Sequence, residues 1–408
     1  MVYYELKKVF ARRGSRIALL FLPMVLAIVM YFIISDERFV NSAGDGENGF
    51  AAIRKMRDVQ KEWAGELTED KIRQVIEENQ RILATPERQS EDIQQQDIAY
   101  SWTQGFSDIR MLINYSFAGF NDYDYYRIDS LSPEVAVDFY PNRIRNLKEF
   151  LDTDGKDAFS EKEKEFLIKK YEELETPMRY DYQRGWKYLF QWAPAILMIT
   201  TMVLGFLCSG IFSGEFQWKS SAILFSSYHG RGKAIRAKLA AGILTGTAVY
   251  WGMVLVYTGV VLGIFGADGA GCPIQSTMAG WKSFYNMTNW QLYLLVVFGG
   301  YLGCLFMLIL VMLASARTNS TAFAVVIPFV LIFLPSFLSG TSISILNKIL
   351  GLLPDQLLQL NQVVKYFKLY EIGGKVMGAV PLLPVIYAVL GVAAVPLIYL
   401  GYRKKQVY

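Results

Sequence analysis

The stretch "IALLFLPMVLAIVMYFII", residues 17–34, contains no charged side chain and is long enough to cross the hydrocarbon core of a bilayer as a helix. It is longer than the apolar region of most signal peptides, and no small-residue cleavage site follows it before "SDERFV", residues 35–40. We therefore expect this stretch to remain in the protein as a membrane anchor.

Five further uncharged runs follow along the chain. None of the six runs contains Asp, Glu, Lys, Arg or His, which argues against an ion-driven secondary transporter, because such proteins carry ionisable groups at membrane depth. The predicted fold class is an all-α polytopic membrane protein with six transmembrane helices. The predicted helices are 17–35, 189–214, 239–265, 291–316, 321–339 and 381–402.

A long polar segment, residues 36–188, separates the first two runs. It carries 22 Lys and Arg against 32 Asp and Glu, a net charge of −10, whereas the rest of the chain is +14. Bulky side chains such as Trp63, Trp102 and Phe139 give it material for a core of its own. We expect a folded, mainly helical extracytoplasmic domain with a loose start near "NSAGDGENG", residues 41–49.

The remaining positive charges define the orientation, because Lys and Arg are retained on the cytoplasmic side. With the N-terminus inside, the inner segments carry 14 Lys and Arg against only Glu5 and Glu215. We therefore expect a multi-pass plasma-membrane protein with both termini cytoplasmic and residues 36–188 outside. The inner segments are an amphipathic N-terminal helix (1–16), a loop (215–238), the short connection 317–320 with Arg317, and a tail (403–408), and the outer loops are 266–290 and 340–380.

Helical periodicity supports the expected content of the polar domain. Apolar residues recur there at spacings of three and four, which is typical of helices with one buried face. The two clearest runs are Ile72, Val75, Ile76 and Leu83, with the polar Asn79 at one position of the same face, and Leu167, Tyr171 and Leu174.

The stretch "LDTDGKDAFSEKE", residues 151–163, has two interpretations. Asp152, Asp154, Gly155 and Glu161 fall at positions 3, 5, 6 and 12 of a calcium loop, but position 1 is Phe150. The alternative is a tight Asp-Gly turn followed by a helix start, with Ser160 and Glu163 spaced as a capping box. We favour the turn and leave calcium binding open.

Three further patterns concern packing. Glycines at four-residue spacing in the spans favour close helix contact, and the apolar outer segment 340–380 is predicted to lie on the membrane surface or to re-enter it. The three cysteines do not form an even disulfide framework. The glycine pairs are Gly242 and Gly246, Gly259 and Gly263, and Gly299 and Gly303, and the cysteines are Cys208, Cys272 and Cys304.

The stretch "SSYHGRGKAIRAKL", residues 226–239, carries the single histidine and a basic cluster. It is not a phosphate-binding loop of the Walker type, because Lys233 is followed by Ala234 in place of Ser or Thr. His229 has no neighbours in sequence that would make it a ligand or a general base. We therefore expect no catalytic site, metal site or cofactor site in this chain and no nucleic-acid partner.

The informative part of this loop lies just upstream, in "SGEFQWKSSAILFSS", residues 213–227. Glu215 stands at the membrane edge, and the apolar residues after it suggest a short amphipathic helix in the cytosol. Exposed apolar side chains on so short a loop need a partner to cover them.

Together these features resemble the permease subunit of an ABC transporter of the type 2 exporter class, with a large insertion between the first two spans. The matching features are the basic N-terminus "MVYYELKKVFARRGSR", the six spans, and a loop in which Glu215, a short helix at 221–227, Gly230 with Arg231, and Lys238 follow in order. The resemblance implies that the loop is a coupling helix, which contacts a separate cytoplasmic ATPase dimer that binds ATP and Mg²⁺. The residues implied in that contact are Glu215, Phe216, Gln217, Trp218, Lys219, Ser220, Ile223 and Arg231.

The resemblance also implies a second permease copy, identical or related, and a path between the two sets of spans for an amphipathic or hydrophobic cargo such as a peptide, an antimicrobial or a lipid. A different hypothesis is a membrane-anchored sensor or immunity protein, whose outer domain binds a ligand without transport. Under the first hypothesis, the candidate path residues are Thr200, Thr201, Met202, Phe206, Phe323 and Phe333.

Overall fold

The computed structural model describes residues 1–338 and 344–405 of the chain. The last residue of the predicted fifth span, the start of the predicted outer segment 340–380 and the end of the tail lie outside the described residues. Within them the fold is all-α, and six helices are long and apolar enough to cross a membrane. The chain is therefore a multi-pass membrane protein, as predicted. The six helices are α2 (Arg13–Asp36), α10 (Arg184–Gln217), α12 (Lys233–Phe265), α13 (Asn289–Thr318), α14 (Thr321–Leu338) and α17 (Ala379–Arg403).

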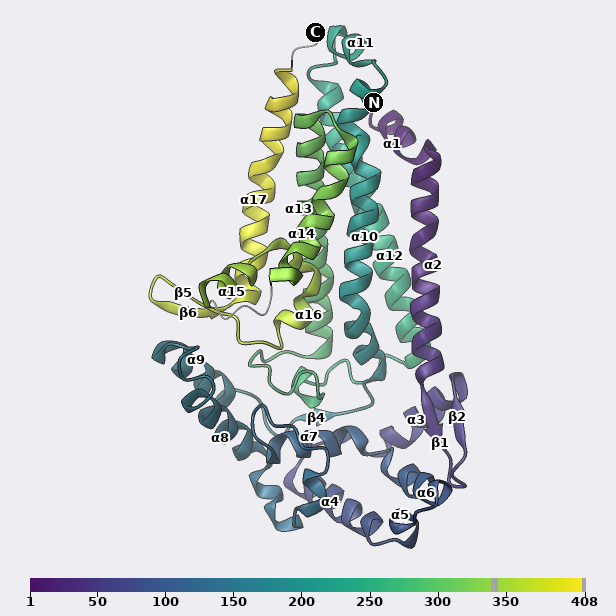
Figure 1. Cartoon of the computed structure of the whole chain (residues 1–408), viewed down its shortest axis with the longest axis vertical. Helices are drawn as coiled ribbons and strands as arrows, with labels where there is room; N and C mark the ends of the chain where they lie inside the picture. Colours follow the sequence, from purple (N-terminus) through teal and green to yellow (C-terminus); the bar gives the residue numbers. More distant parts are fainter. Residues whose placement is uncertain (339–343, 406–408) are drawn as a thin grey trace.

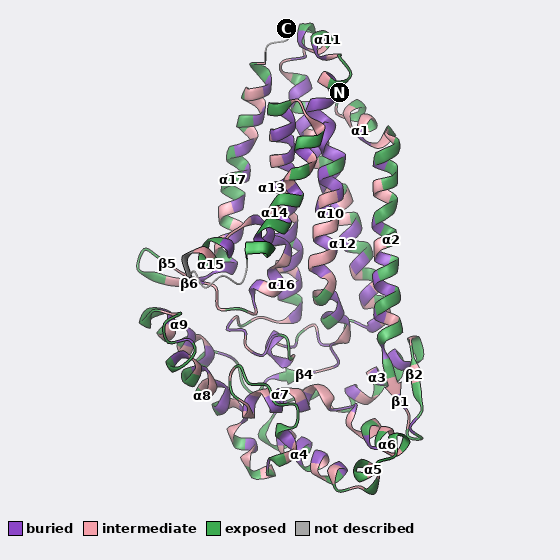
Figure 2. Ribbon diagram, in the orientation of Figure 1, coloured by how far each residue is buried: buried purple, intermediate pink, exposed green. Residues whose placement is uncertain are grey.

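These helices form a bundle with α10 and α13 at its centre. In their apolar windows, 72% of α10 and 61% of α13 is buried, whereas the other four helices are buried by 33% or less. Figure 2 shows more buried residues along α10 and α13, above all toward the end of the bundle near the termini, and mixed colours along α2 and α17. Both chain ends lie at one end of the bundle, and the polar domain lies at the other (Figure 1).

Two of the three glycine pairs allow close packing, as predicted. A side chain at Gly242 or Gly246 would meet Met312 or Leu308 of α13 at 2.4 Å, so both glycines bring α12 against α13. Gly299 and Gly303 of α13 do not receive another spanning helix. They make room for Leu360 and Leu357 of the segment between α14 and α17. At Gly259 and Gly263 no described atom lies within 4 Å of an added Cβ, so this pair is open.

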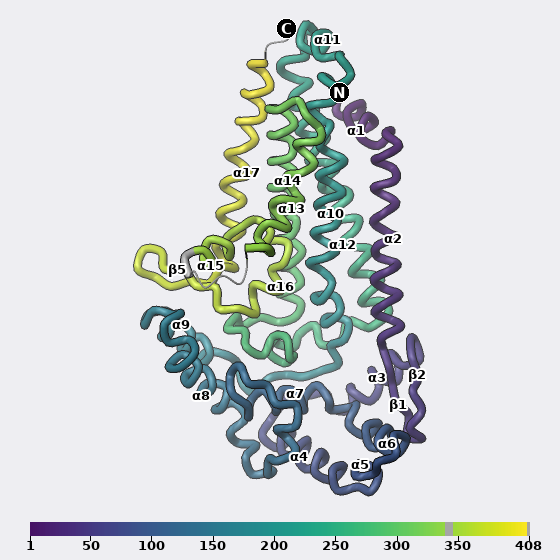
Figure 3. Tube along the Cα trace, in the orientation of Figure 1, coloured from purple at the N-terminus to yellow at the C-terminus, as the bar shows by residue number. Residues whose placement is uncertain are grey.

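The segment between α14 and α17 folds back against α13 (Figure 3). Leu357, Leu358 and Leu360 are buried there, so this part of the segment packs against the bundle. Pro354 cannot continue a preceding helix, and the segment is broken into short elements followed by a projecting hairpin. These elements are α15 (Ser344–Leu350), η4 (Pro354–Gln359), α16 (Leu360–Val363), β5 (Leu369–Ile372) and β6 (Lys375–Gly378).

The polar domain is mainly helical and has its own hydrophobic core. The spacing that predicted a helix near residue 72 corresponds to α4, whose Ile72, Val75 and Ile76 are fully buried. Its helices are α3 (Phe50–Lys61), α4 (Glu69–Leu83), α5 (Pro86–Gln89), α6 (Ile93–Thr103), α7 (Ser107–Phe117), η1 (Arg127–Ser130), η2 (Pro133–Asp138), α8 (Phe139–Asp152) and α9 (Glu161–Glu172), and its strands are β1 (Arg38–Val40), β2 (Gly46–Asn48), β3 (Gly65–Glu66) and β4 (Arg179–Tyr180).

The predicted loose start at 41–49 is wrong. Strands β1 and β2 pair there as an antiparallel hairpin. The side-chain carbonyl of Asn41 accepts hydrogen bonds from the backbone N–H groups of Ala43 and Asp45 at 2.9 and 3.0 Å. Small polar residues in this stretch therefore build a defined turn, because Asn stabilises turns through its own side chain.

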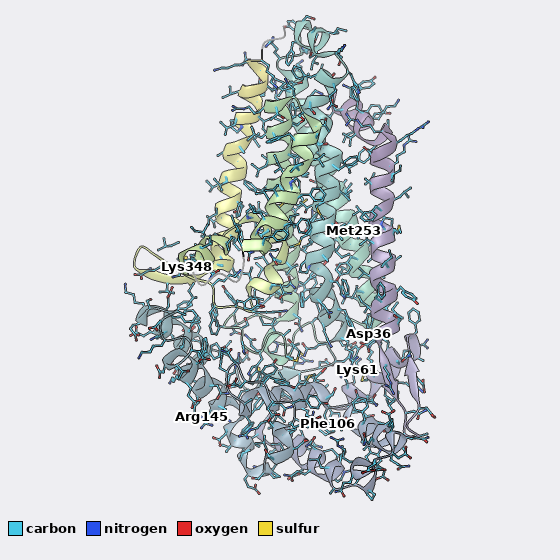
Figure 4. All side chains as sticks on the ribbon, viewed as in Figure 1. Asp36, Lys61, Phe106, Arg145, Met253 and Lys348 are labelled. Carbon is cyan, nitrogen blue, oxygen red and sulfur yellow. The ribbon has the colours of Figure 1, made fainter. Side chains whose placement is uncertain are left out.

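The stretch 151–163 forms the predicted turn and helix start. Ser160 and Glu163 make a complete capping box at the start of α9, and the Gly155 N–H donates to the Phe150 carbonyl at 2.8 Å. The second Glu163 oxygen accepts a hydrogen bond from Lys348 of α15 at 2.9 Å. Glu163 thereby links the polar domain to the segment between α14 and α17, where Figure 4 labels Lys348.

A buried arginine fixes the polar domain to the loop between α12 and α13, which contains η3 (Ile274–Ser276). The Arg143 guanidinium donates to the Trp281 and Ser283 carbonyls at 2.7 and 3.2 Å and stacks on the Trp281 ring. Asp268 of the same loop pairs with Lys61 and Arg57 of α3 at 2.7 and 2.5 Å. Figure 4 shows Lys61 close below Asp36, at the lower end of α2.

Candidate functional site

The loop after α10 forms a short separate helix at the end of the bundle that carries both termini (Figure 1). Helix α10 ends at Gln217, and α11 (Ser221–Ser226) follows after a tight turn. In this turn Lys219 has a left-handed φ of 54°, and the Ser220 N–H and hydroxyl both return to Glu215, at 2.9 Å from its carbonyl and 2.7 Å from its carboxylate. The expected short helix is present, but Glu215 to Gln217 belong to the end of α10.

Glu215 is the centre of a buried ion cluster. One of its oxygens lies 2.8 Å from Lys238 Nζ of α12 and 2.9 Å from Lys8 Nζ of α1 (Val2–Ala11). Glu5 completes the cluster at 3.1 Å from both lysines. Lys238 is only 1% exposed. Two carboxylates and two ammonium groups therefore balance, which a buried cluster requires to offset the loss of hydration.

The N-terminal helix is shorter than the predicted 1–16, because the backbone becomes extended at Arg12 and α2 starts at Arg13. This break directs Arg12 toward α10. Its guanidinium stacks on the Trp218 ring at 4.9 Å and donates to the Gly210 carbonyl at 3.4 Å. A Cβ at Gly210 would lie 2.2 Å from the guanidinium, so a larger residue there would displace the Arg12 side chain.

Charge on the N-terminal helix is maintained by these contacts. Partial burial lowers the pKa of Lys8, but the hydrogen bond to Glu215 and the charge of Glu5 outweigh it, so the net pKa is raised. Lys8 therefore stays protonated and holds α1 against the end of α10.

The inner face of α11 packs on an aromatic cluster. Phe225 is buried against Phe216 and Tyr402, with ring centroids 6.0 and 5.2 Å apart. Arg231 stacks on Phe225 at 4.8 Å and donates to the Arg403 and Lys405 carbonyls at the end of α17. The side chains of Phe216 and Arg231, both predicted to contact the ATPase, are therefore engaged in contacts within the chain.

The outer face of α11 and the turn before it is exposed and partly apolar. Trp218 is 55% exposed, Ile223 is 75% exposed and Tyr228 is 96% exposed. Gln217 and Lys219 are exposed as well. We call Gln217, Trp218, Lys219, Ile223 and Tyr228 the tip surface.

The path of the loop back to α12 depends on Gly230. A Cβ there would lie 1.7 Å from the Leu224 carbonyl oxygen, so any other residue displaces the end of α11. His229 stacks on Tyr228 at a centroid distance of 4.7 Å. Among the described residues, no group of three or more His, Cys, Asp or Glu side chains is placed to hold a metal ion.

The candidate path residues fall into two groups. Thr200 and Thr201 are fully buried inside the bundle, where their hydroxyls donate to the Ile196 and Leu197 carbonyls of their own helix. The other residues lie toward the surface: Met202 is half-buried, and Phe206, Phe323 and Phe333 are 42%, 57% and 46% exposed. The structure does not bring the two groups together on one face.

Sequence reasoning missed the partners of the loop. Glu5, Lys8 and Arg12 belong to the basic N-terminus, and Tyr402 and Lys405 belong to the C-terminal end, where Lys405 lies 4.7 Å from the Phe216 ring. One signal was available in the charges. Glu5 is the sole acidic residue of the basic segment 1–16, and Glu215 is the sole acidic residue of the basic loop 215–238, so each segment offers a carboxylate for the cations of the other. Pairing across such separations in sequence needs the fold.

Six apolar helices define the class of this chain as an all-α multi-pass membrane protein. Comparisons of the chain with protein-family models, with curated proteins and with solved structures each give no match.

Proposed function

We propose that this chain is the membrane-spanning permease subunit of an ATP-driven ABC exporter of the type 2 class. The observation that carries the proposal is α11, a six-residue helix that exposes Ile223, together with the turn before it, which exposes Trp218, while the base of the helix is fastened to the bundle. Exposed apolar side chains on a short helix are suited to a partner protein. The partner we propose is a dimer of separate ATPase subunits, which bind ATP and Mg²⁺.

The ion cluster supplies the mechanical connection that such a role needs. Ser220 ties the start of α11 to Glu215 of α10, and Glu215 in turn binds Lys8 of α1 and Lys238 of α12. Movement of the tip surface would therefore displace three helices together. Closure of the ATPase dimer around ATP would favour one arrangement of the spans over another, which is a shift between two populated states.

The charge distribution supports the proposed orientation in the plasma membrane. The end with both termini carries 14 Lys and Arg against two Glu, whereas the polar domain has a net charge of −10. Because Lys and Arg are retained in the cytoplasm, this asymmetry supports a tip surface on the cytoplasmic side, where an ATPase is available, and residues 36–188 outside.

Exposed aromatic side chains on α14 and the open Gly259 and Gly263 on α12 leave apolar faces for a second copy of the chain or a related subunit. An amphipathic or hydrophobic cargo, such as a peptide, an antimicrobial or a lipid, would pass between the two copies. Phe206, Phe323 and Phe333 are the residues we assign to that path, because their side chains are not enclosed within this chain.

The test is purification of the full-length chain from its native membranes in a mild detergent, followed by identification of co-purifying proteins and assay of ATP hydrolysis. We expect an ATPase with Walker motifs, and vanadate-sensitive hydrolysis that is lost in Ile223→Asp and reduced in Trp218→Ala. The matched control is Ile372→Asp, because Ile372 is also exposed, at 52%, but lies in β5, in the hairpin that projects from the side of the fold away from α11 (Figure 1).

Co-purification that survives both tip substitutions would place the ATPase contact elsewhere and overturn the assignment of α11. Absence of any ATPase from the wild-type preparation, despite intact insertion, would favour the membrane-anchored sensor or immunity protein instead.

A further inference from the structure

A cavity of about 300 Å³ lies where the polar domain meets the spanning helices. Its walls come from α7, from the first turns of α10 and α13, from the loop around η3, and from α16 with the residues that follow it. Apolar side chains form much of the wall, and this volume is at the lower end of the range for small-molecule sites. The apolar residues used in the argument are Met111, Phe190, Ile274, Met278, Leu292 and Val364.

Cationic groups without anionic partners line the same cavity. Lys187 and Lys365 have no ion pair within residues 1–338 and 344–405, and Arg184 leaves its buried Nε without an acceptor, although its Nη1 binds Glu37. Asp108 is the single acidic residue among the described lining residues, and its carboxylate already accepts a hydrogen bond from Gln60. The cavity therefore has an excess of positive charge.

Two further observations favour an anionic ligand with a hydrogen-bond donor. Asn361 is fully buried, and its Oδ1 has no hydrogen-bond donor, although its Nδ2 donates to the Phe190 carbonyl at 2.6 Å. Burial also lowers the pKa of Lys365, because the charged ammonium group loses hydration. A bound anion would stabilise this charge. A buried acceptor beside unpaired cations suits a ligand that carries both a negative group and a hydroxyl donor.

Aromatic residues place this cavity at the level of the membrane surface. Trp186, Trp290 and Tyr293 form a cluster with centroid distances of 5.4 to 6.4 Å at the same ends of α10 and α13. Tryptophan and tyrosine gather where the hydrocarbon core meets the headgroups. The cavity therefore lies where an amphiphile can place its polar group in the protein and its chain along the apolar wall.

We propose that this cavity binds an anionic amphiphile whose headgroup carries a phosphate and a hydroxyl, with Lys187 and Lys365 on the phosphate and Asn361 Oδ1 accepting from the hydroxyl. The site does not depend on the proposed ATPase partner. Its occupant can be a lipid of the surrounding bilayer or a soluble phosphate ester, and both share this headgroup chemistry.

The experiment measures binding of a tail-fluorescent phosphatidylglycerol to the full-length chain in a neutral maltoside detergent, by fluorescence anisotropy. We expect unlabelled phosphatidylglycerol to compete and phosphatidylcholine to compete at least tenfold less well. Lys365→Gln should weaken binding at least tenfold, because it removes a charge-assisted hydrogen bond, and a tenfold change in affinity corresponds to about 1.4 kcal/mol. Lys365→Arg should restore most of the affinity.

Two more variants separate a specific site from general attraction to charge. Ala279→Trp fills the cavity without changing charge and should abolish binding, whereas Lys375→Gln removes an exposed cation of β6 and should leave the affinity unchanged. Displacement of the probe by glycerol 3-phosphate alone would support the site and assign it to a soluble ester. Equal competition by both lipids, or binding that is unchanged in both Lys365→Gln and Ala279→Trp, would overturn the proposal.

Discussion

Lys238 Nζ lies 2.8 Å from Glu215 Oε1 and 3.1 Å from Glu5 Oε2, and its side chain is 1% exposed. It also donates to the Ile211 carbonyl at 2.8 Å. A lysine enclosed in this way has all its protons bound within the protein. The contact between α1, α10 and α12 therefore depends on the pairing of opposite charges, and the fastening of α11 depends on the same carboxylate.

Glu215→Gln should destabilise the chain by about 3 kcal/mol, because Lys238 would keep its buried charge without its nearest carboxylate. The double variant Glu215→Gln with Lys238→Met should recover most of this loss, because Glu5 and Lys8 remain as a neutral pair. Thermal unfolding in detergent measures both effects. A double variant no more stable than Glu215→Gln alone would show that the charge balance does not decide the stability.

Gly230→Ala should disorder the end of α11. The added Cβ would lie 1.7 Å from the Leu224 carbonyl oxygen, and overpacking against backbone costs about 1 to 3 kcal/mol. Limited trypsin digestion at Arg231 should accelerate several-fold. Gly232→Ala is the matched control, because no described atom beyond the neighbouring residues of the chain lies within 4 Å of a Cβ at that position. Equal digestion rates for the two variants would contradict the structural role of Gly230.

Arg143→Met should loosen the joint between the polar domain and the loop after α12. The substitution leaves the buried Trp281 carbonyl without its donor, at a cost of about 1 to 3 kcal/mol for an unsatisfied group, and leaves the Ser283 carbonyl with the Gln275 amide as its remaining donor. Proteolytic release of the polar domain should therefore be faster. The control is Arg145→Met, because Arg145 lies on the same helix but is exposed (Figure 4), and this variant should behave like the wild type. If the polar domain is released equally fast from both variants, Arg143 does not hold it to the loop after α12.

Asp355 should make the stability depend on pH. Burial raises the pKa of its carboxyl to about 6, even though Gln356 and Gln359 donate to one oxygen. The folded state then binds the proton more tightly than the unfolded state, so the free energy of unfolding falls as pH rises from about 4 to 6, by about 3 kcal/mol. Below pH 4 and above pH 6 this contribution is constant.

Asp355→Asn should flatten this dependence, since the amide stays neutral at every pH. Thermal unfolding in detergent from pH 4 to 7.5 measures the slope, with Asp157→Asn as the control because Asp157 is exposed. A slope that persists in Asp355→Asn would assign the titration to another group.

The sequence alone determined the six spans, the polar domain between the first two, and the capping box at Ser160 and Glu163. These features depend on local quantities: the length of uncharged runs, helical spacing, and hydrogen bonds between residues three apart. The same local reasoning failed at 41–49, because the Asn41 side chain organises a turn that composition alone suggests is loose.

Only the tertiary structure decided which loop residues face outward and which are fastened to the bundle. Glu215 and Phe216 are adjacent to Gln217 and Trp218 in sequence, but the first pair packs against α1, α12 and α17 and the second pair is exposed. The partners of Glu215 lie more than 200 residues away in α1 and 23 residues away in α12. Local pattern cannot specify such contacts, because they form only when separate helices pack side by side.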